Sequence, residues 1–251
     1  GSGWIRIRTG GAIIAAGVAL RIHPNTLTLI GVLINVGAAI ALGRDHFIWA
    51  GVIMIVANIF DFIDGKVAHI TNTQSAFGAF WDSTLDRFSD IALFIGLIYL
   101  YSNLRRTDYV IVTSLAMMFS IMTSYARARA ESLIEKCKVG FMERPERIVL
   151  FMIGAFTNRM AAVLWVILIL SIVTVANRIH YTYLALNKRP MPAGSNPLST
   201  IFWRAFFWRD ERGTLAYDLW VIVILAFTWL TPPVWLRDPT ANGDGLWSLL
   251  G

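Results

Sequence analysis

Long, almost uninterrupted apolar stretches are the feature that most constrains the fold of this chain. Several of them approach or exceed the roughly 17–25 residues that a helix needs to cross a bilayer. Of the 251 residues, 56% are hydrophobic and only 15% are charged, whereas an ordinary soluble domain carries about 25% charged residues. The apolar runs are continuous rather than alternating, which disfavours a β-barrel. We therefore expect an all-α integral membrane protein.

Polar turns between the apolar stretches predict the helix boundaries. Residues 21–186 are expected to form a core of six transmembrane helices, at about residues 26–42, 47–70, 77–101, 108–132, 145–156 and 160–186. Residues 4–20 mix arginines with apolar residues and predict an amphipathic helix in the membrane interface. Residues 187–251 form the third region, a polar loop followed by an additional hydrophobic helix at about residues 215–230 and a tail.

Lysine and arginine are distributed unequally between the two ends of these helices. Most of the 22 fall on the side of the N-terminus, and basic residues are enriched on the cytoplasmic side of membrane proteins. We therefore expect a multi-pass protein of the cell inner (cytoplasmic) membrane, with its N-terminus and the acidic site described below facing the cytoplasm. The formal net charge of +6 is explained by this bias and suits anionic lipid headgroups. It does not indicate nucleic-acid binding, because no soluble basic domain is present.

Four aspartates lie at the junction of the second and third expected helices. Asp61 and Asp64 come near the end of the second helix, and Asp82 and Asp86 come near the start of the third. Spacings of three and four residues place each pair on one helix face, and an antiparallel helix pair would bring the two faces together. Carboxylates near membrane depth need compensating cations or protons. Two hard divalent cations with oxygen ligands are the expected partners, and salt bridges to nearby arginines are the structural alternative.

Small residues share these two helix faces. Gly65 and Ala68 lie on the face of the first aspartate pair, and Gly78 lies on the face of the second. Without large side chains, these positions would leave room for a ligand beside the metal ions.

The combined pattern resembles the signature of the CDP-alcohol phosphotransferase (phosphatidyltransferase) family over about residues 20–186. All four aspartates, both glycines and the alanine match, in the spacing Asp61-x2-Asp64-Gly65-x2-Ala68-x9-Gly78-x3-Asp82-x3-Asp86. One position departs from the family pattern, because His69 stands where the family usually has arginine. It is either a substitute for that arginine or a residue of the membrane interface.

This resemblance implies a reaction of membrane phospholipid synthesis, the transfer of a phosphatidyl group from CDP-diacylglycerol to an alcohol with release of CMP. It implies two Mg²⁺ ions (Mn²⁺ is the alternative), one held by Asp61, Asp64 and Asp82 and one by Asp61, Asp82 and Asp86. Asp86 is the candidate general base for the acceptor hydroxyl. The implied partners are membrane lipids and a second copy of the chain, in a homodimer. The implied nucleotide site consists of Asp61, Asp64, Gly65, Ala68, His69, Gly78 and Asp82.

Four arginines at the cytoplasmic helix ends are candidates to bind a phosphate on the acceptor. They are Arg127, Arg144, Arg147 and Arg178. Residues 125–131 and 143–147 resemble prokaryotic phosphatidylinositol-phosphate synthases of the family, which implies inositol phosphate as the acceptor. Glycerol 3-phosphate, the acceptor of phosphatidylglycerol-phosphate synthase, is the alternative. Each arginine has a plainer explanation too, as a topology signal or a snorkelling side chain.

An ion-coupled transporter is the alternative from another functional class, with the aspartates as an ion pathway. Such a protein is expected to carry acidic residues near mid-membrane on broken helices, often in two repeated halves. Here the aspartates cluster at one end of one helix pair and no internal repeat is visible. The sequence therefore favours the enzyme.

Overall fold

The structure is a computed structural model that describes residues 24–70, 74–189, 196, 199, 203 and 214–241. All regular elements within these residues are helices, which confirms the predicted all-α class. The interfacial helix expected over residues 4–20 lies outside the described residues. The helices are α2 (Pro24–Gly43), α3 (Phe47–Ile70), α4 (Ala76–Asn103), α5 (Thr107–Glu131), α6 (Arg144–Thr157), α7 (Met160–Leu186), α9 (Leu215–Leu230) and α10 (Pro233–Leu236).

These boundaries follow the apolar stretches of the sequence closely. Four helices, α2, α3, α5 and α7, are long and apolar enough to cross a membrane. The other two members of the expected six-helix core are a 28-residue helix, α4, which carries several charges, and a 14-residue helix, α6. The exact count of six crossings therefore stays a prediction, as do the domain boundaries at residues 21 and 186.

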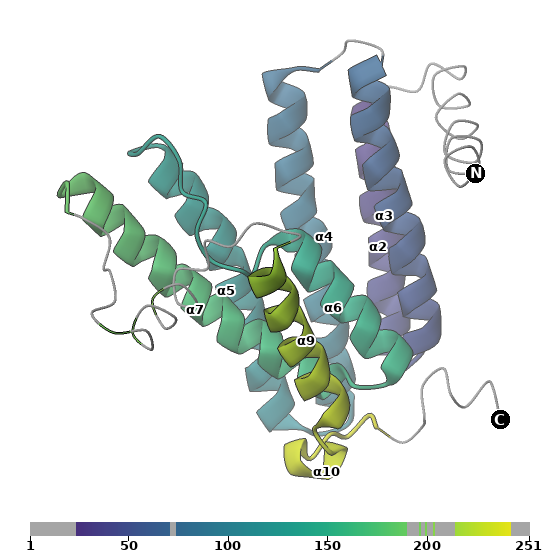
Figure 1. The fold of residues 1–251 in the computed structure, drawn as a ribbon. Helices are drawn as coiled ribbons and strands as arrows, with labels where there is room; N and C mark the ends of the chain where they lie inside the picture. The colour runs from purple at the N-terminus through teal and green to yellow at the C-terminus, as the bar shows by residue number, and fades with distance from the viewer. Residues whose placement is uncertain are drawn as a thin grey trace, which may run out of the picture. The chain divides into compact units, whose positions relative to one another are not determined.

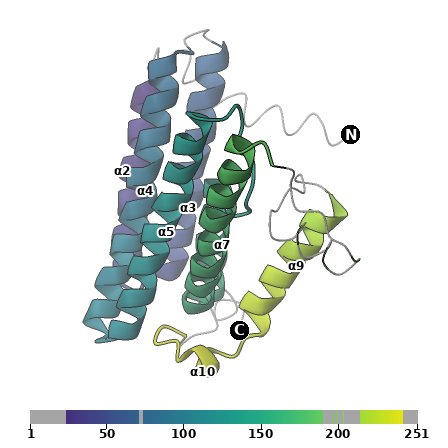
Figure 2. The ribbon, with the colours of Figure 1, turned by 90° about the vertical axis from the view of Figure 1, so that its left-hand side faces the viewer.

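The chain contacts define two compact units, residues 1–100 and 101–251. In the first unit, α2, α3 and α4 lie side by side in both views (Figures 1 and 2). Leu27 of α2 packs against Ile63 and Val67 of α3. Gly96 lets α4 approach α2 closely, because a Cβ atom at this position would collide with the carbonyl oxygen of Ala39. Close packing of α2 thus fixes both helices that carry the aspartates.

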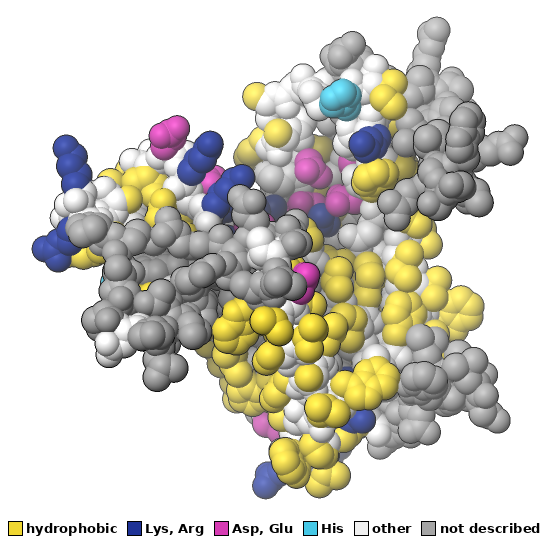
Figure 3. All heavy atoms as spheres, viewed as in Figure 1, with side chains coloured by type: hydrophobic (Ala, Val, Ile, Leu, Met, Phe, Trp, Pro, Cys, Tyr) yellow, Lys and Arg dark blue, Asp and Glu magenta, His cyan; other side chains and the backbone are white. Residues whose placement is uncertain are grey.

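In the second unit, α7 is the central helix and contacts α5, α6, α9 and α10. Its N-terminal third is buried at Leu164 and Ile167, and Figure 2 shows α5 beside it. The additional helix α9 matches the hydrophobic segment expected at residues 215–230. Leu219, Ile222 and Leu230 of α9 are exposed, and Figure 3 shows hydrophobic side chains over α9 and α10. Such an apolar outer surface suits contact with lipid.

Candidate active site

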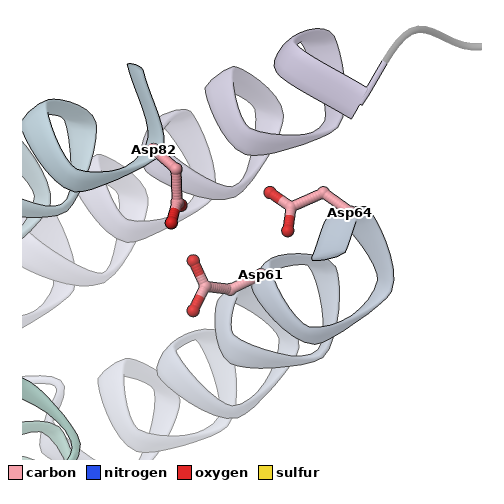
Figure 4. Close-up of side chains that lie close together, drawn as sticks. All are labelled: Asp61, Asp64 and Asp82. Carbon is pink, nitrogen blue, oxygen red and sulfur yellow. The ribbon is translucent and has the colours of Figure 1, made fainter. Parts of the chain in front are cut away.

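Three of the four aspartates converge at one end of the first unit. Asp61 and Asp64 come from the C-terminal part of α3 and Asp82 from the first turns of α4. Each offers a carboxylate oxygen, and these oxygens lie within 4.8 Å of one another. Figure 4 shows the three carboxylates pointing toward a common space. The predicted meeting of the two acidic helix faces is therefore confirmed for these residues.

The chemistry of this cluster suits a hard divalent cation. Asp64 is buried, and Asp61 and Asp82 are half-buried, so their negative charges are only partly screened by water. Carboxylate charges at this separation repel one another, and a bound cation would offset that repulsion. Carboxylate oxygens are the ligands that Mg²⁺ and Ca²⁺ prefer. The residues present thus fit the expected metal centre.

Asp86 lies apart from this convergence. It is four residues beyond Asp82 on α4, about 6 Å further along the helix axis, and it is not one of the three that share the 4.8 Å cluster. Its carboxylate is 3.8 Å from the guanidinium of Arg87. Its assignment as a ligand of a second metal ion and as the general base stays a prediction.

The small residues and His69 have different surroundings. Gly65 is exposed, and no heavy atom of a neighbouring residue lies within 4 Å of the place where its Cβ would be. A Cβ at Gly78 would lie 3.2 Å from the hydroxyl of Ser75. Ala68 and His69 belong to the last turn of α3, and His69 is exposed. The open space at Gly65 is compatible with a ligand lying against α3.

A threonine that the sequence did not single out contacts the acidic cluster. Thr28 Oγ1 donates a hydrogen bond of 2.6 Å to Asp64 Oδ2, and both residues are buried. The available sequence signal was its polarity within an apolar helix, together with Asn35 seven residues later on the same face. Polar residues in membrane helices commonly face the bundle interior, but that rule does not name their partners.

The arginines expected to bind the acceptor lie in the second unit. Arg178 of α7 is only 2% exposed, and its Nε donates to the carbonyl oxygen of Val139 at 3.1 Å. Its Nη1 donates to the carbonyl oxygen of Thr123. Arg147 is also buried and donates to the Thr123 hydroxyl at 3.3 Å. Two guanidinium groups thus meet around one residue of α5.

Acidic residues complete this arginine group. Arg127 Nη1 lies 2.8 Å from Glu143 and its Nε lies 3.2 Å from Glu131. Arg178 Nη2 lies 3.5 Å from the same Glu143 oxygen. Arg144, the first residue of α6, is half-buried. The structure therefore gathers Arg127, Arg147 and Arg178, and their role toward an acceptor phosphate stays a prediction.

Sequence comparisons identify relatives over the core of the chain. A family model described as CDP-alcohol phosphatidyltransferase matches residues 21–185. The chain is 34% identical over 166 residues to the phosphatidylinositol phosphate synthase of Mycobacteroides abscessus, covering 62% of this chain and 76% of the relative. It is 37% identical over 163 residues to the archaetidylinositol phosphate synthase of Pyrococcus horikoshii, covering 64% and 84%.

Solved structures of a phosphatidylinositol phosphate synthase have a fold similar to that of this chain. The phosphatidylinositol phosphate synthase of Mycobacterium tuberculosis, solved with CDP-DAG bound, superposes with a TM-score of 0.67 at 26% identity, covering 74% of this chain and all of that one. The same enzyme in complex with manganese and citrate has a TM-score of 0.67 at 25% identity, covering 76% and 97%. The family match spans well over half of the chain and includes all seven motif positions. The protein therefore belongs to the CDP-alcohol phosphatidyltransferase family of membrane transferases.

Proposed function

We propose that the protein transfers a phosphatidyl group from CDP-diacylglycerol to inositol phosphate, giving phosphatidylinositol phosphate and CMP. The observation that carries this proposal is the convergence of Asp61, Asp64 and Asp82 within the family motif. Relatives named as phosphatidylinositol phosphate synthases support the choice of acceptor, and a similar structure with CDP-DAG bound supports the choice of lipid donor.

The proposed step is a direct displacement at phosphorus. The acceptor hydroxyl oxygen forms a bond to the phosphorus on the lipid side of the diphosphate, and the bond from that phosphorus to the CMP oxygen breaks. Asp86 accepts the proton of the attacking hydroxyl. A carboxylate is a weak base, so its contribution depends mainly on its position at the hydroxyl.

The acidic cluster is the proposed site for two divalent cations. Asp61, Asp64 and Asp82 would hold the first ion, and Asp61, Asp82 and Asp86 would hold the second. When bound, Mg²⁺ or Mn²⁺ supplies positive charge that stabilises the diphosphate and the departing CMP. The rest of the nucleotide site belongs to the chain itself. The space beside α3 is open at Gly65, which would let the cytidine diphosphate lie close to the helix. Ala68, His69 and Gly78 are the other proposed members of the nucleotide site.

The arginine group is the proposed binding site for the acceptor phosphate. Arg178 and Arg147 are buried and bonded to the main chain or hydroxyl of Thr123, so their guanidinium groups have little freedom. Fixed guanidinium groups bind phosphate oxygens well, because their donors need not be ordered again on binding. Arg127 and Arg144 are proposed to add positive charge to the same site.

The proposed location is the inner membrane, with the N-terminus and the catalytic residues on the cytoplasmic side. The excess of lysine and arginine on that side supports this orientation, and inositol phosphate is a water-soluble substrate that must reach the site from an aqueous compartment. A homodimer is expected from the family resemblance.

A CMP-release assay on the purified protein tests the proposal. CDP-diacylglycerol is supplied with inositol phosphate, inositol, glycerol 3-phosphate or serine in parallel, and Asp82→Asn serves as the inactive control. We expect release of CMP to be fastest with inositol phosphate. Faster release with glycerol 3-phosphate would reassign the protein as a phosphatidylglycerol-phosphate synthase, and no release with any acceptor would overturn the proposed transferase activity.

A further inference from the structure

We propose that Thr28 is a positioning residue, which holds Asp64 in the orientation that divalent-cation binding requires. This inference rests on the proposed function, because it assigns a role toward the same metal centre. It concerns α2, a helix that carries none of the seven motif residues.

The contact itself is short and buried. Thr28 Oγ1 lies 2.6 Å from Asp64 Oδ2, and each residue is 6% exposed. A hydroxyl that donates to a carboxylate at such a distance forms a charge-assisted hydrogen bond. Because one oxygen of Asp64 is held from α2, the carboxylate cannot rotate freely about its side-chain bonds, and its direction toward Asp61 and Asp82 is fixed.

The packing around Thr28 sets this contact. Leu27, its neighbour in sequence, is buried against Ile63 and Val67, which flank Asp64 on α3. Threonine is β-branched, so its first side-chain torsion has few options in a helix, and the observed rotamer points the hydroxyl at Asp64. The backbone register of α2 and α3 and the rotamer of Thr28 thus favour the same hydrogen bond.

The same helix face also fixes α4, the other source of the cluster. Asn35 lies seven residues after Thr28, two turns along the same face. Its side-chain amide donates to the hydroxyl of Ser89, and both residues are buried. Near the start of α2, the carbonyl oxygen of Asn25 accepts a bond of 3.2 Å from Trp81 Nε1. Because α2 contacts both acidic helices through polar groups, it fixes their mutual register.

The type of side chain matters as much as its place. A lysine or arginine at position 28 would form an ion pair with Asp64 and compete with a metal cation. A neutral hydroxyl orients the carboxylate and leaves its negative charge for the cation. Hydrogen-bond partners of metal ligands act in this way, and their removal typically lowers metal affinity or activity by about 10- to 100-fold.

The test compares Mn²⁺ binding to the full-length protein in detergent, without substrates, by the electron paramagnetic resonance signal of free Mn²⁺. Thr28→Val removes the hydroxyl and keeps the shape, Thr28→Ser keeps the hydroxyl, and Thr26→Val changes an exposed threonine of the same helix. We expect Thr28→Val to weaken Mn²⁺ binding by about 10- to 100-fold, with Thr28→Ser and Thr26→Val close to wild type. Thermal unfolding of each variant shows whether the fold is retained.

The outcomes separate this inference from the proposed function. Equal Mn²⁺ affinity of wild type and a folded Thr28→Val protein would overturn the role of Thr28 and leave the metal centre in place. If the valine variant does not fold, Thr28→Ala removes the same hydroxyl and carries the same expectation. A folded wild-type protein that binds no Mn²⁺ would overturn the metal centre of the proposed function, and the role of Thr28 with it.

Discussion

The acidic cluster of the first unit and the arginine group of the second are built differently. Asp61, Asp64 and Asp82 point toward one another, so their charges repel in the absence of a cation. The arginine group holds its charges through the chain's own acceptors, since Arg178 donates to two carbonyl oxygens and shares Glu143 with Arg127. A bound cation would offset the repulsion within the acidic cluster, whereas carbonyl and carboxylate oxygens of the chain already contact the guanidinium groups of the arginine group.

This difference has consequences for how each site should respond to change. Removing the cation should affect the acidic cluster most, because three carboxylate groups close together repel one another. Removing one arginine should alter both acceptor binding and local stability. Arg127 and Arg178 share Glu143, and Arg147 and Arg178 both contact Thr123. The four predictions below test this contrast, from the largest expected effect to the smallest.

Chelation should have the largest effect. We expect EDTA to reduce CMP release to the background of the assay, because a metal ion contributes several kcal/mol of charge stabilisation, and each 1.36 kcal/mol is a factor of ten in rate. Excess Mg²⁺ or Mn²⁺ should restore activity. CMP release that persists after complete metal removal would show that the acidic cluster does not depend on a cation, and would contradict the proposed difference between it and the arginine group.

Replacing the proposed general base, Asp86, should have the second largest effect on activity. Asp86→Asn keeps the size of the side chain but cannot accept a proton, so kcat should fall by about 10²- to 10⁴-fold. Binding of CDP-diacylglycerol, measured by equilibrium dialysis, should remain close to wild type, because the three converging aspartates are unchanged. Wild-type turnover would remove Asp86 from the mechanism.

Truncating Arg178 should act on the acceptor. Hydrogen bonds to charged groups are worth about 1.5–3 kcal/mol, so Arg178→Ala should raise the KM for inositol phosphate by about 10- to 100-fold. The KM for CDP-diacylglycerol should change much less. Arg129→Ala is the matched control, because Arg129 is an exposed arginine near the end of α5 that contacts Ser132.

Steady-state kinetics with each substrate varied in turn provide the check. The thermal midpoint should also fall for Arg178→Ala, because the carbonyl oxygens of Val139 and Thr123 lose a buried donor. Equal increases in KM for both substrates would argue against an acceptor site at Arg178.

Cys137 should show the smallest effect. It is buried with Ala130 and Val139 beside the arginine group, and burial raises the pKa of its thiol above the ordinary value. Less thiolate is then present at neutral pH, so alkylation should be slow at pH 7 and accelerate as the pH rises. Cys137→Ala should leave turnover nearly unchanged. The rate of alkylation can be measured by mass spectrometry. Fast alkylation at pH 7 would contradict the burial of Cys137.

Much of the fold could be predicted from the sequence, because long apolar stretches and polar turns determine helix boundaries directly. The prediction at residues 47–70 and 160–186 agrees with α3 and α7. The acidic cluster could be predicted equally well from the sequence. Asp61 and Asp64 share one helix face and Asp82 lies on the next helix, which leaves few ways for the two faces to meet. Local periodicity was sufficient for both.

Other contacts depend on residues far apart in the chain, and periodicity does not identify them. Thr28 bonds Asp64 across 36 positions, and Arg178 bonds Val139 across 39. The partner of Arg178 is a main-chain carbonyl, which every residue possesses, so no pattern of side chains could reveal it. Such contacts follow from the tertiary packing of α2 on α3, and of α7 with the segment that precedes α6.

The most direct test of the central claim is an anomalous diffraction measurement at the manganese edge, on crystals of the protein grown with Mn²⁺. We predict an anomalous peak within direct-ligand distance of the carboxylate oxygens of Asp61, Asp64 and Asp82. Crystals of active protein that bind Mn²⁺ elsewhere, with no peak between these three residues, would contradict the proposed metal centre.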